Sequence, residues 1–158
     1  MLPDAARFAA SLPFAQAMRE HPWLYPAVET LHIVGFAVLV GAVVMFDLRV
    51  LGFGRALPVR PLARHLLPWS AGSMLLVLPT GLLLFVADPA ALLANQVFLL
   101  KLALIAVAGL NALAFHAGPY RNADRWPARA PGRALLHALL SLGLWIGVIA
   151  CGRLIAYF

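Results

Sequence analysis

The sequence has 158 residues, of which 63% are hydrophobic and 11% charged, and its mean hydropathy is +0.90. A soluble domain of this length could not bury that much apolar surface, so the composition excludes a water-soluble globular protein and indicates an integral membrane protein. The net charge of +6 does not point to nucleic acid, because eight of the eleven arginines fall in two short segments between apolar runs. That distribution is a membrane-topology signal.

The N-terminal segment, residues 3–21, mixes apolar side chains with charged ones such as Arg19. This pattern predicts a short amphipathic helix lying on the membrane surface. Within it, Ser11 followed by Pro13 predicts a helix start. The next segment, Pro22–Pro26, is aromatic and bounded by prolines, which is typical of the headgroup level of a bilayer.

Four apolar runs follow, each near the roughly 20 residues that about 30 Å of hydrocarbon requires. They predict transmembrane helices at about residues 27–50, 66–87, 96–117 and 134–157. The links between them are too short for a second domain. We therefore expect residues 1–158 to form a single all-α membrane domain, an antiparallel four-helix bundle with a short N-terminal surface helix.

The links between the apolar runs differ in charge. The first link (residues 51–64) and the third (118–133) are rich in arginine, whereas the second (88–95) has neither lysine nor arginine. By the positive-inside rule, the first and third links are cytoplasmic, and both termini lie on the outer side with the second link. We expect a multi-pass protein of the bacterial inner membrane with its N-terminus and C-terminus in the periplasm.

Polar residues inside the runs can be sorted by depth at about 1.5 Å of helix rise per residue. His32 lies about one turn inside the first run, Lys101 lies a similar distance into the third, and Arg153 is near the end of the fourth. All three belong to one outer layer, with Glu29 just above. A polar group at such a depth is a functional-site candidate, because it is costly without a partner.

A b-type haem needs axial donors from facing helices, small residues that admit the flat macrocycle, and cations near its propionates. The outer layer offers His32 as a metal ligand and Gly35, one turn below, for ring clearance. Lys101 or Arg153 could serve a propionate or the second axial position. In the alternative, Glu29, Lys101 and Arg153 form a buried ion-pair network with His32 hydrogen-bonded beside it.

An inner layer contains His116 and His137, which should sit at matching depth on adjacent helices. They could hold a second haem, which would allow electron transfer across the bilayer. The alternative is a pair of partly hydrated histidines near the basic interface. Asp47 and Arg49 end the first run at this level, where an ion pair or a loop anchor is expected.

Two further patterns bear on helix packing. Pro79 followed by Thr80 predicts a kink in the second span, with the threonine hydroxyl satisfying the carbonyl that the proline frees. Gly143 and Gly147 match a small-xxx-small contact. Its partner is either another helix of the bundle or a second copy in a homo-oligomer.

Three short motifs occur in order: Leu31–Gly35 (LHIVG) opens the first span, Pro79–Leu83 (PTGLL) lies in the second, and Phe98–Leu102 (FLLKL) opens the third. This ordered set resembles the CopD-like four-helix membrane proteins, which include copper-resistance membrane subunits and the HemJ-type protoporphyrinogen oxidases. The resemblance implies a b haem bound through His32 and Lys101. Asp47–Gly52 and the C-terminal segment are more similar to a bacterial branch of that group whose function is not established.

Three functions remain open from the sequence. The first is a b-type haem protein for electron transfer, or a membrane oxidoreductase that is porphyrinogen oxidase-like or quinone-linked, with a quinone or a periplasmic redox protein as partner. The second is a copper-handling membrane subunit with His32, Glu29 and His21 as ligands. The third is a structural subunit without a cofactor. In every case the lipid bilayer surrounds the chain.

Overall fold

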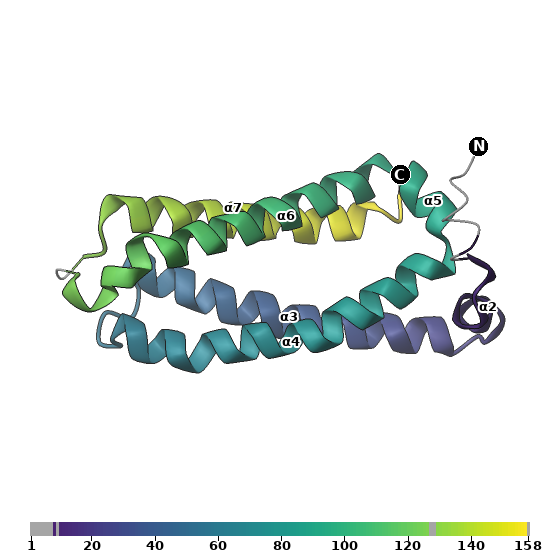
Figure 1. Ribbon diagram of the computed structural model, residues 1–158, viewed down its shortest axis with the longest axis horizontal. Helices are drawn as coiled ribbons and strands as arrows, with labels where there is room; N and C mark the ends of the chain where they lie inside the picture. The colour runs from purple at the N-terminus through teal and green to yellow at the C-terminus, as the bar shows by residue number, and fades with distance from the viewer. Residues whose placement is uncertain (1–7, 9, 127–128, 158) are drawn as a thin grey trace.

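Four long helices make up most of the molecule, and a computed structural model describes them together with the rest of residues 8, 10–126 and 129–157. All four are long and apolar enough to cross a membrane. They are α3 (Leu24–Leu51), α4 (Val59–Ala87), α6 (Gln96–Ala117) and α7 (Gly132–Leu154), as Figure 1 shows. The chain is therefore an all-α, multi-pass membrane protein, as the sequence predicted.

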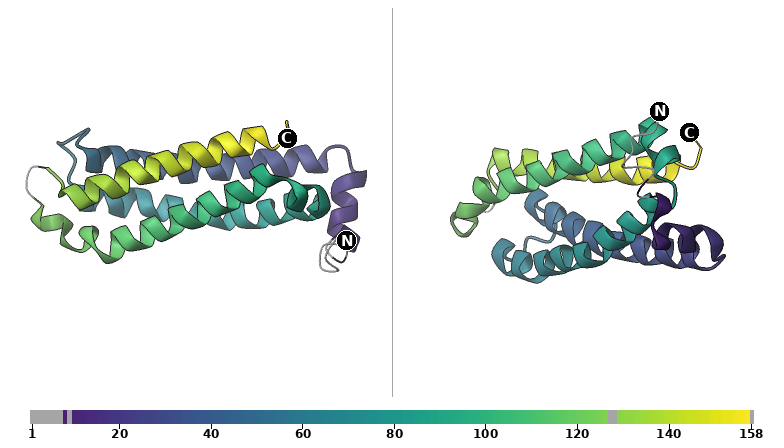
Figure 2. Two further views of the ribbon diagram at one scale, coloured as in Figure 1. Left: turned by 90° about the horizontal axis from the view of Figure 1, so that it is seen from above. Right: turned by 45° about the vertical axis from the view of Figure 1, so that its right-hand side comes forward.

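Three short helices cover the ends of the bundle. They are α2 (Pro13–Glu20), α5 (Pro89–Ala94) and the 3-10 helix η1 (Pro119–Arg125). Figure 2 shows α2 and α5 at the same end as the last turn of α7, which we call the α2 end. The opposite end, with η1 and the α3–α4 link, is the η1 end.

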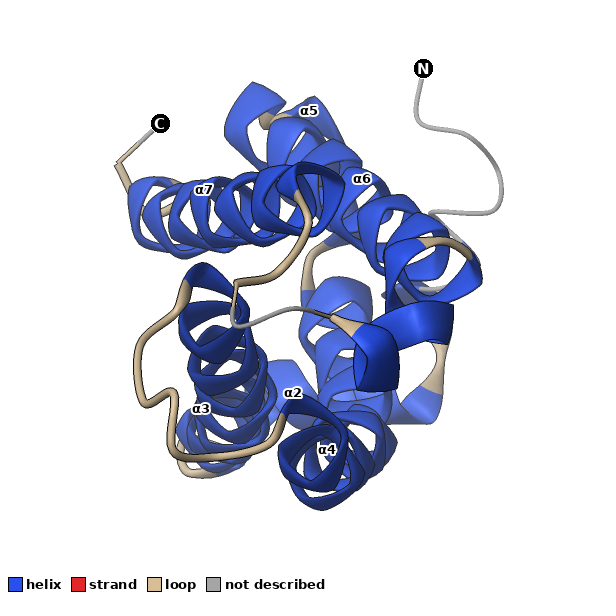
Figure 3. Ribbon diagram, turned by 90° about the vertical axis from the view of Figure 1, so that its left-hand side faces the viewer, coloured by secondary structure: helices blue, strands red, loops and turns tan. Residues whose placement is uncertain are grey.

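The long helices form an incomplete ring. Helix α3 packs along α4, α6 packs along α7, and α7 packs on α3. Viewed down the bundle in Figure 3, the order is therefore α4, α3, α7, α6. Between the described residues of α4 and α6, no two Cα atoms come within 8 Å. We call this open side the α4–α6 seam.

The largest difference from the predicted spans is the start of α4. This helix begins at Val59 instead of residue 66, and its N-cap Pro58 is extended (φ −62°, ψ 140°). A proline in the first helical turn loses no intrahelical hydrogen bond, so Pro61 is tolerated there. Arg60 and Arg64 consequently lie on a helical extension, not in an irregular link.

Helix α2 has Pro13 at its first position, which confirms the predicted helix start. The Ser11 hydroxyl donates to a carbonyl three residues earlier, so it does not cap the helix. Ala15 and Met18 are buried, and Met18 joins a small core cluster with the start of α3 and the end of α4. The part of the predicted surface helix at residues 3–7 lies outside the described residues.

The main core lies near the η1 end. It is built from small and aromatic side chains of all four long helices: Phe46, Val50, Ala63, Phe115, Ala134 and Ala138. Ala63 and Ala134 are fully buried, and small residues let membrane helices approach closely. An ion pair of 2.7 Å between Arg60 and Asp124 joins α4 to η1 at the rim.

The kink of α4 is stabilised differently from the prediction. Pro79 leaves the carbonyl of Leu75 without its helical donor, and Figure 1 shows α4 curving toward α5. The hydroxyl of Thr80 donates instead to the carbonyl of Leu76, at 2.6 Å. The expectation that Thr80 satisfies the carbonyl freed by the proline is therefore wrong. The threonine hydroxyl donates to the carbonyl four residues before Thr80, not to the one four residues before Pro79.

Of the two glycines of α7, Gly143 and Gly147, one lies against another helix of the bundle. A Cβ built on Gly147 would lie 3.1 Å from Leu104 of α6, whereas one built on Gly143 would meet nothing within 4 Å. Gly147 therefore permits the close α6–α7 packing. This assigns its partner to a neighbouring helix of the same chain.

Candidate functional site

His32 lies in α3 and points at the kinked segment of α4. Its Nδ1 is 3.0 Å from Oγ1 of Thr80, a side chain that is only 6% exposed. A Cβ built on Gly81 would lie 3.1 Å from Cε1 of the imidazole, which is tighter than ordinary contact. The glycine therefore makes room for the ring, and the threonine fixes its orientation.

The hydrogen-bond network also assigns the tautomer of His32. A hydroxyl has one proton, and that of Thr80 is donated to the carbonyl of Leu76, which can only accept. The contact with His32 must therefore be donated by Nδ1–H. In the neutral imidazole this leaves the lone pair on Nε2 free, as in histidines that bind metals through Nε2.

Lys101, one turn into α6, is half-buried and lies against α7. A Cβ built on Gly152 would be 3.8 Å from its Nζ, so the amine rests on the backbone of α7. Within the described ranges, its Nζ has neither a hydrogen bond nor an ion pair. His32 lies near the α2 end of α3 and Lys101 lies near the α2 end of α6, so we call the level of these two residues the His32–Lys101 layer.

Two aromatic pairs bracket the His32–Lys101 layer. One turn nearer the α2 end, Phe85 of α4 stacks on Phe98 of α6, with ring centroids 6.0 Å apart and an interplanar angle of 14°. This pair bridges the α4–α6 seam. One turn nearer the η1 end, Phe36 of α3 makes an edge contact of 5.8 Å with Trp145 of α7. The layer thus lies between apolar, aromatic walls.

Gly35 does not have the role that the sequence suggested. A Cβ built there would lie 3.0 Å from Cγ2 of Val77 and 3.2 Å from Cδ2 of Leu76. Gly35 is buried in the contact between α3 and α4, so it serves helix packing and leaves no clearance for a macrocycle. Gly81 makes room for the imidazole of His32 itself.

Arg153 lies at the correct end of the bundle but faces outward. It is exposed, its guanidinium donates to the hydroxyl of Tyr157, and it lies 4.8 Å from the centre of that ring. The predicted network of Glu29, Lys101 and Arg153 is not formed, since none of the three has an ion pair with another described residue. Arg153 therefore does not join the layer.

The histidines at the η1 end lie at the same level, as predicted, and Phe115 contacts both imidazoles (centroid distances 5.6 and 6.0 Å). His137 Nδ1 is 2.6 Å from Oδ1 of Asn111, whose Nδ2 donates to the His137 carbonyl at 3.0 Å. His116 donates from Nδ1 to its own helix, at the carbonyl of Ala112. An aromatic core residue thus lies against both rings.

Asp47 and Arg49 do not pair with each other. Arg49 anchors the α3–α4 link through hydrogen bonds to the carbonyls of Leu57 and Arg55, so the loop-anchor alternative is the correct one for this residue. Asp47 is 7% exposed and faces the interior, where Ser141 of α7 lies close to its carboxyl group.

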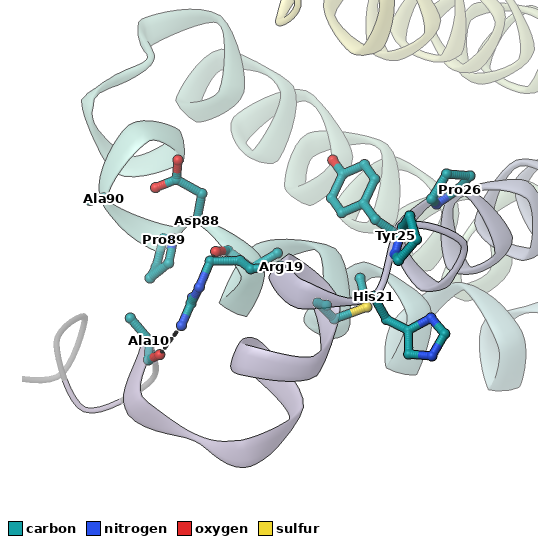
Figure 4. Close-up of a pocket in the computed structure, with 11 residues that line it drawn as sticks. Ala10, Arg19, His21, Tyr25, Pro26, Asp88, Pro89 and Ala90 are labelled. Atoms are coloured by element: carbon teal, nitrogen blue, oxygen red, sulfur yellow. Dashed lines mark hydrogen bonds between the residues drawn. The ribbon is translucent and has the colours of Figure 1, made fainter.

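A cavity of about 730 Å³ lies at the α2 end, between α2, the start of α3 and the α4–α5 link. Arg19 crosses it and donates to the carbonyls of Ala10 and Ala87. Figure 4 shows the His21 imidazole turned away from Arg19 and Asp88. Throughout the described chain, three or more His, Cys, Asp or Glu side chains are nowhere gathered as a metal site.

The sequence did not predict the roles of four residues that contact His32, His137 or Asp47 in the structure. Thr80 and Gly81 were treated only as part of a kink, and Asn111 and Ser141 were not singled out. A weak signal existed for Asn111, because a buried amide inside a spanning segment is costly without a partner. Nothing in a single sequence showed that Gly81 would face His32.

No protein-family model, no curated protein and no solved structure matches this sequence. The fold defines the chain as a four-helix multi-pass membrane protein. Its function has to be argued from the His32–Lys101 layer itself.

Proposed function

We propose that this chain is a b-type haem-binding membrane protein in which Nε2 of His32 is an axial ligand. The observation that carries the proposal is the hydrogen bond from His32 Nδ1–H to Thr80, 3.0 Å long. An acceptor on one ring nitrogen orients the imidazole, keeps the other nitrogen available and raises its basicity toward a metal. In the part of the chain that the structure describes, neither His21, His116 nor His137 combines a hydrogen bond from Nδ1 to a hydroxyl with a glycine packed against its ring.

The surroundings of the layer are suited to a flat macrocycle. Gly81 and Gly152 let the imidazole and the amine lie close to the backbones of α4 and α7, and the two aromatic pairs give apolar walls on either side. Small and aromatic residues around a buried donor are the requirements of a haem site between bundle helices. Lys101, which has no ion-pair partner among the described residues, would take the second axial position or pair with a propionate.

The resemblance to the CopD-like group supports the same two residues. The motifs that contain His32 and Lys101 occur in the order found in that group, and the kink residues beside His32 belong to the motif between them, Pro79–Leu83. Membership of the group, and porphyrinogen oxidation as an activity, remain part of this proposal.

The charge distribution supports an orientation in the membrane. The arginine-rich links lie at the η1 end, which we propose to be cytoplasmic in a bacterial inner membrane. The α2 end, and with it the His32–Lys101 layer, then faces the periplasm. A haem there supplies a one-electron couple, so the partners of the protein would be a quinone or a periplasmic redox protein.

One haem is proposed, not two. At the η1 end the ring of Phe115 lies against both His116 and His137, where a second macrocycle would need space. The role of this chain at the His32–Lys101 layer is to hold the imidazole of His32, exclude water with aromatic walls and offer the amine of Lys101.

The visible spectrum of detergent-purified protein from haem-replete cells tests the proposal. We expect a Soret band that shifts on reduction with dithionite. A colourless preparation would contradict the proposal, and metal analysis of the same sample would then separate a copper-handling subunit from a structural subunit without a cofactor.

A further inference from the structure

Asp47 is an acidic side chain buried within a membrane-spanning helix. It is 7% exposed, and Oδ2 has no hydrogen-bond partner in the part of the chain that the structure describes. The other described acidic residues, Glu20, Glu29, Asp88 and Asp124, are exposed at the ends of the bundle. Asp47 is therefore in a different situation from each of them.

No positive charge compensates Asp47 from the helices packed around it, as far as the described residues go. Arg49, on the same helix, is committed to the α3–α4 link. From α4, Arg60 is paired with Asp124 on η1, while Arg64 and His65 are exposed. An isolated carboxylate in apolar surroundings is strongly disfavoured and takes up a proton instead.

Helix α7 offers polar groups to Asp47. The hydroxyl of Ser141, itself 8% exposed, is close enough to be its hydrogen-bond partner. His137 lies one turn before Ser141 on the same helix, a spacing that places two side chains on one face. The Nδ1–H of His137 is held by Asn111, which leaves Nε2 able to accept a proton.

The donor set is suited to a proton and not to a metal cation. Hard cations take six or more oxygen ligands, and in the part of the chain that the structure describes no other His, Cys, Asp or Glu side chains gather with Asp47 as a metal site. Oδ1 of Asn111, on the neighbouring helix, is already occupied by the imidazole of His137.

We propose that Asp47 is a proton-binding site inside the membrane, which exchanges its proton with the η1 end through Ser141 and His137. In each transfer, a proton on His137 Nε2 passes to the hydroxyl oxygen of Ser141 while the hydroxyl proton passes to the carboxylate of Asp47. The imidazole loses one proton, the carboxyl gains one, and Ser141 is unchanged. This site is independent of the proposed haem site.

Infrared spectroscopy of the purified full chain tests whether Asp47 carries the proton. We expect a carboxylic acid C=O band at neutral pH that shifts when aspartate is carboxyl-labelled with ¹³C in the unmodified sequence. The band should be lost in Asp47→Asn and retained in Asp124→Asn. Absence of an aspartic acid band from the labelled wild-type protein at neutral pH would overturn the proposal, whatever the variants do.

Transfer of the same samples into D2O tests the exchange. We expect the Asp47 band to shift to lower frequency, and Ser141→Ala to slow that shift several-fold. Ser73→Ala is the matched control, because Ser73 is also buried in a spanning helix but donates only to the carbonyl of Ser70. A band that does not shift in D2O, or equal exchange in Ser141→Ala and wild type, would overturn the proposed route.

Discussion

His32 differs from His116 and His137 in what holds its Nδ1 and in what faces its ring. His116 donates to its own helix and His137 to an amide of the core, whereas His32 donates to a hydroxyl beside a glycine. The depth of His32 in the first span was enough to make it the first candidate ligand. The hydrogen bond and the glycine contact that distinguish its ring could not be predicted from depth. The contact joins residues 48 positions apart, so it depends on the register of α3 against α4.

Replacing Thr80 by valine removes the acceptor of His32 Nδ1–H at nearly constant side-chain volume. We expect Thr80→Val to lower haem affinity about 10- to 100-fold, the usual effect of losing an outer-shell partner of a ligating histidine. Thr80→Ser keeps the hydroxyl and should bind haem nearly as wild type. Haem titration of the two apoproteins measures the difference, and equal affinities would contradict the assigned role of Thr80.

Replacing Asn111 by alanine leaves the imidazole and the carbonyl of His137 without their α6 partner. Interhelical hydrogen bonds in membranes contribute about 0.6 to 2 kcal/mol, so we expect Asn111→Ala to lower the free energy of unfolding by about 1 kcal/mol. Gln96→Ala is a matched control, since Gln96 is an exposed amide of the same helix. Unfolding in mixed detergent micelles measures both variants, and equal stabilities would argue against the α6–α7 link.

At the scale of the elements, the lengths and apolar character of the four spans were enough to predict the helices. Helix α6 has the bounds that the sequence indicated. The start of α4 was misplaced, because hydropathy marks where a helix enters the hydrocarbon and not where it begins. Pro58 and Pro61, which indicate a helical first turn, lie before that point.

Two glycines of α3 give a matched test of helix packing. A Cβ at Gly35 would press on Val77 and Leu76 of α4, while one at Gly41 would meet nothing within 4 Å. We expect Gly35→Ala to destabilise the protein by about 1 to 3 kcal/mol through overpacking. Gly41→Ala should be neutral or stabilising by up to about 1 kcal/mol, because alanine favours a helix over glycine.

Free energies of unfolding for the two glycine variants, measured in the same micelles, decide the matter. If Gly35→Ala were as stable as Gly41→Ala, the close approach of α3 and α4 at the level of His32 would not exist. The hydrogen bond from His32 to Thr80 would then lose its structural basis.

At the scale of the whole molecule, the bundle is open on one side. The described backbones of α4 and α6 stay apart along their length, and the stacked Phe85 and Phe98 bridge them near the α2 end. Sequence depth predicted which residues share a layer but not the order of the helices around the bundle. It therefore could not show that Arg153 would be exposed and would contact Tyr157.

The orientation in the membrane has its own test. In a Cys151→Ala background, we expect a membrane-impermeant maleimide to label Ala91→Cys on intact bacterial cells, because α5 would face the periplasm. Asn122→Cys, on η1, should react only after permeabilisation. Both replaced side chains are exposed in the structure. The reverse pattern would contradict the proposed topology and place the His32–Lys101 layer near the cytoplasm.

The most direct test of the central claim is a titration of the apoprotein with haem, followed at the Soret band, in wild type, His32→Ala and His65→Ala. His65 is an exposed histidine at the start of α4 and is the matched control. We predict saturation at one haem per chain for wild type and His65→Ala, and loss of that binding in His32→Ala. Unchanged stoichiometry and spectrum in His32→Ala would contradict the account.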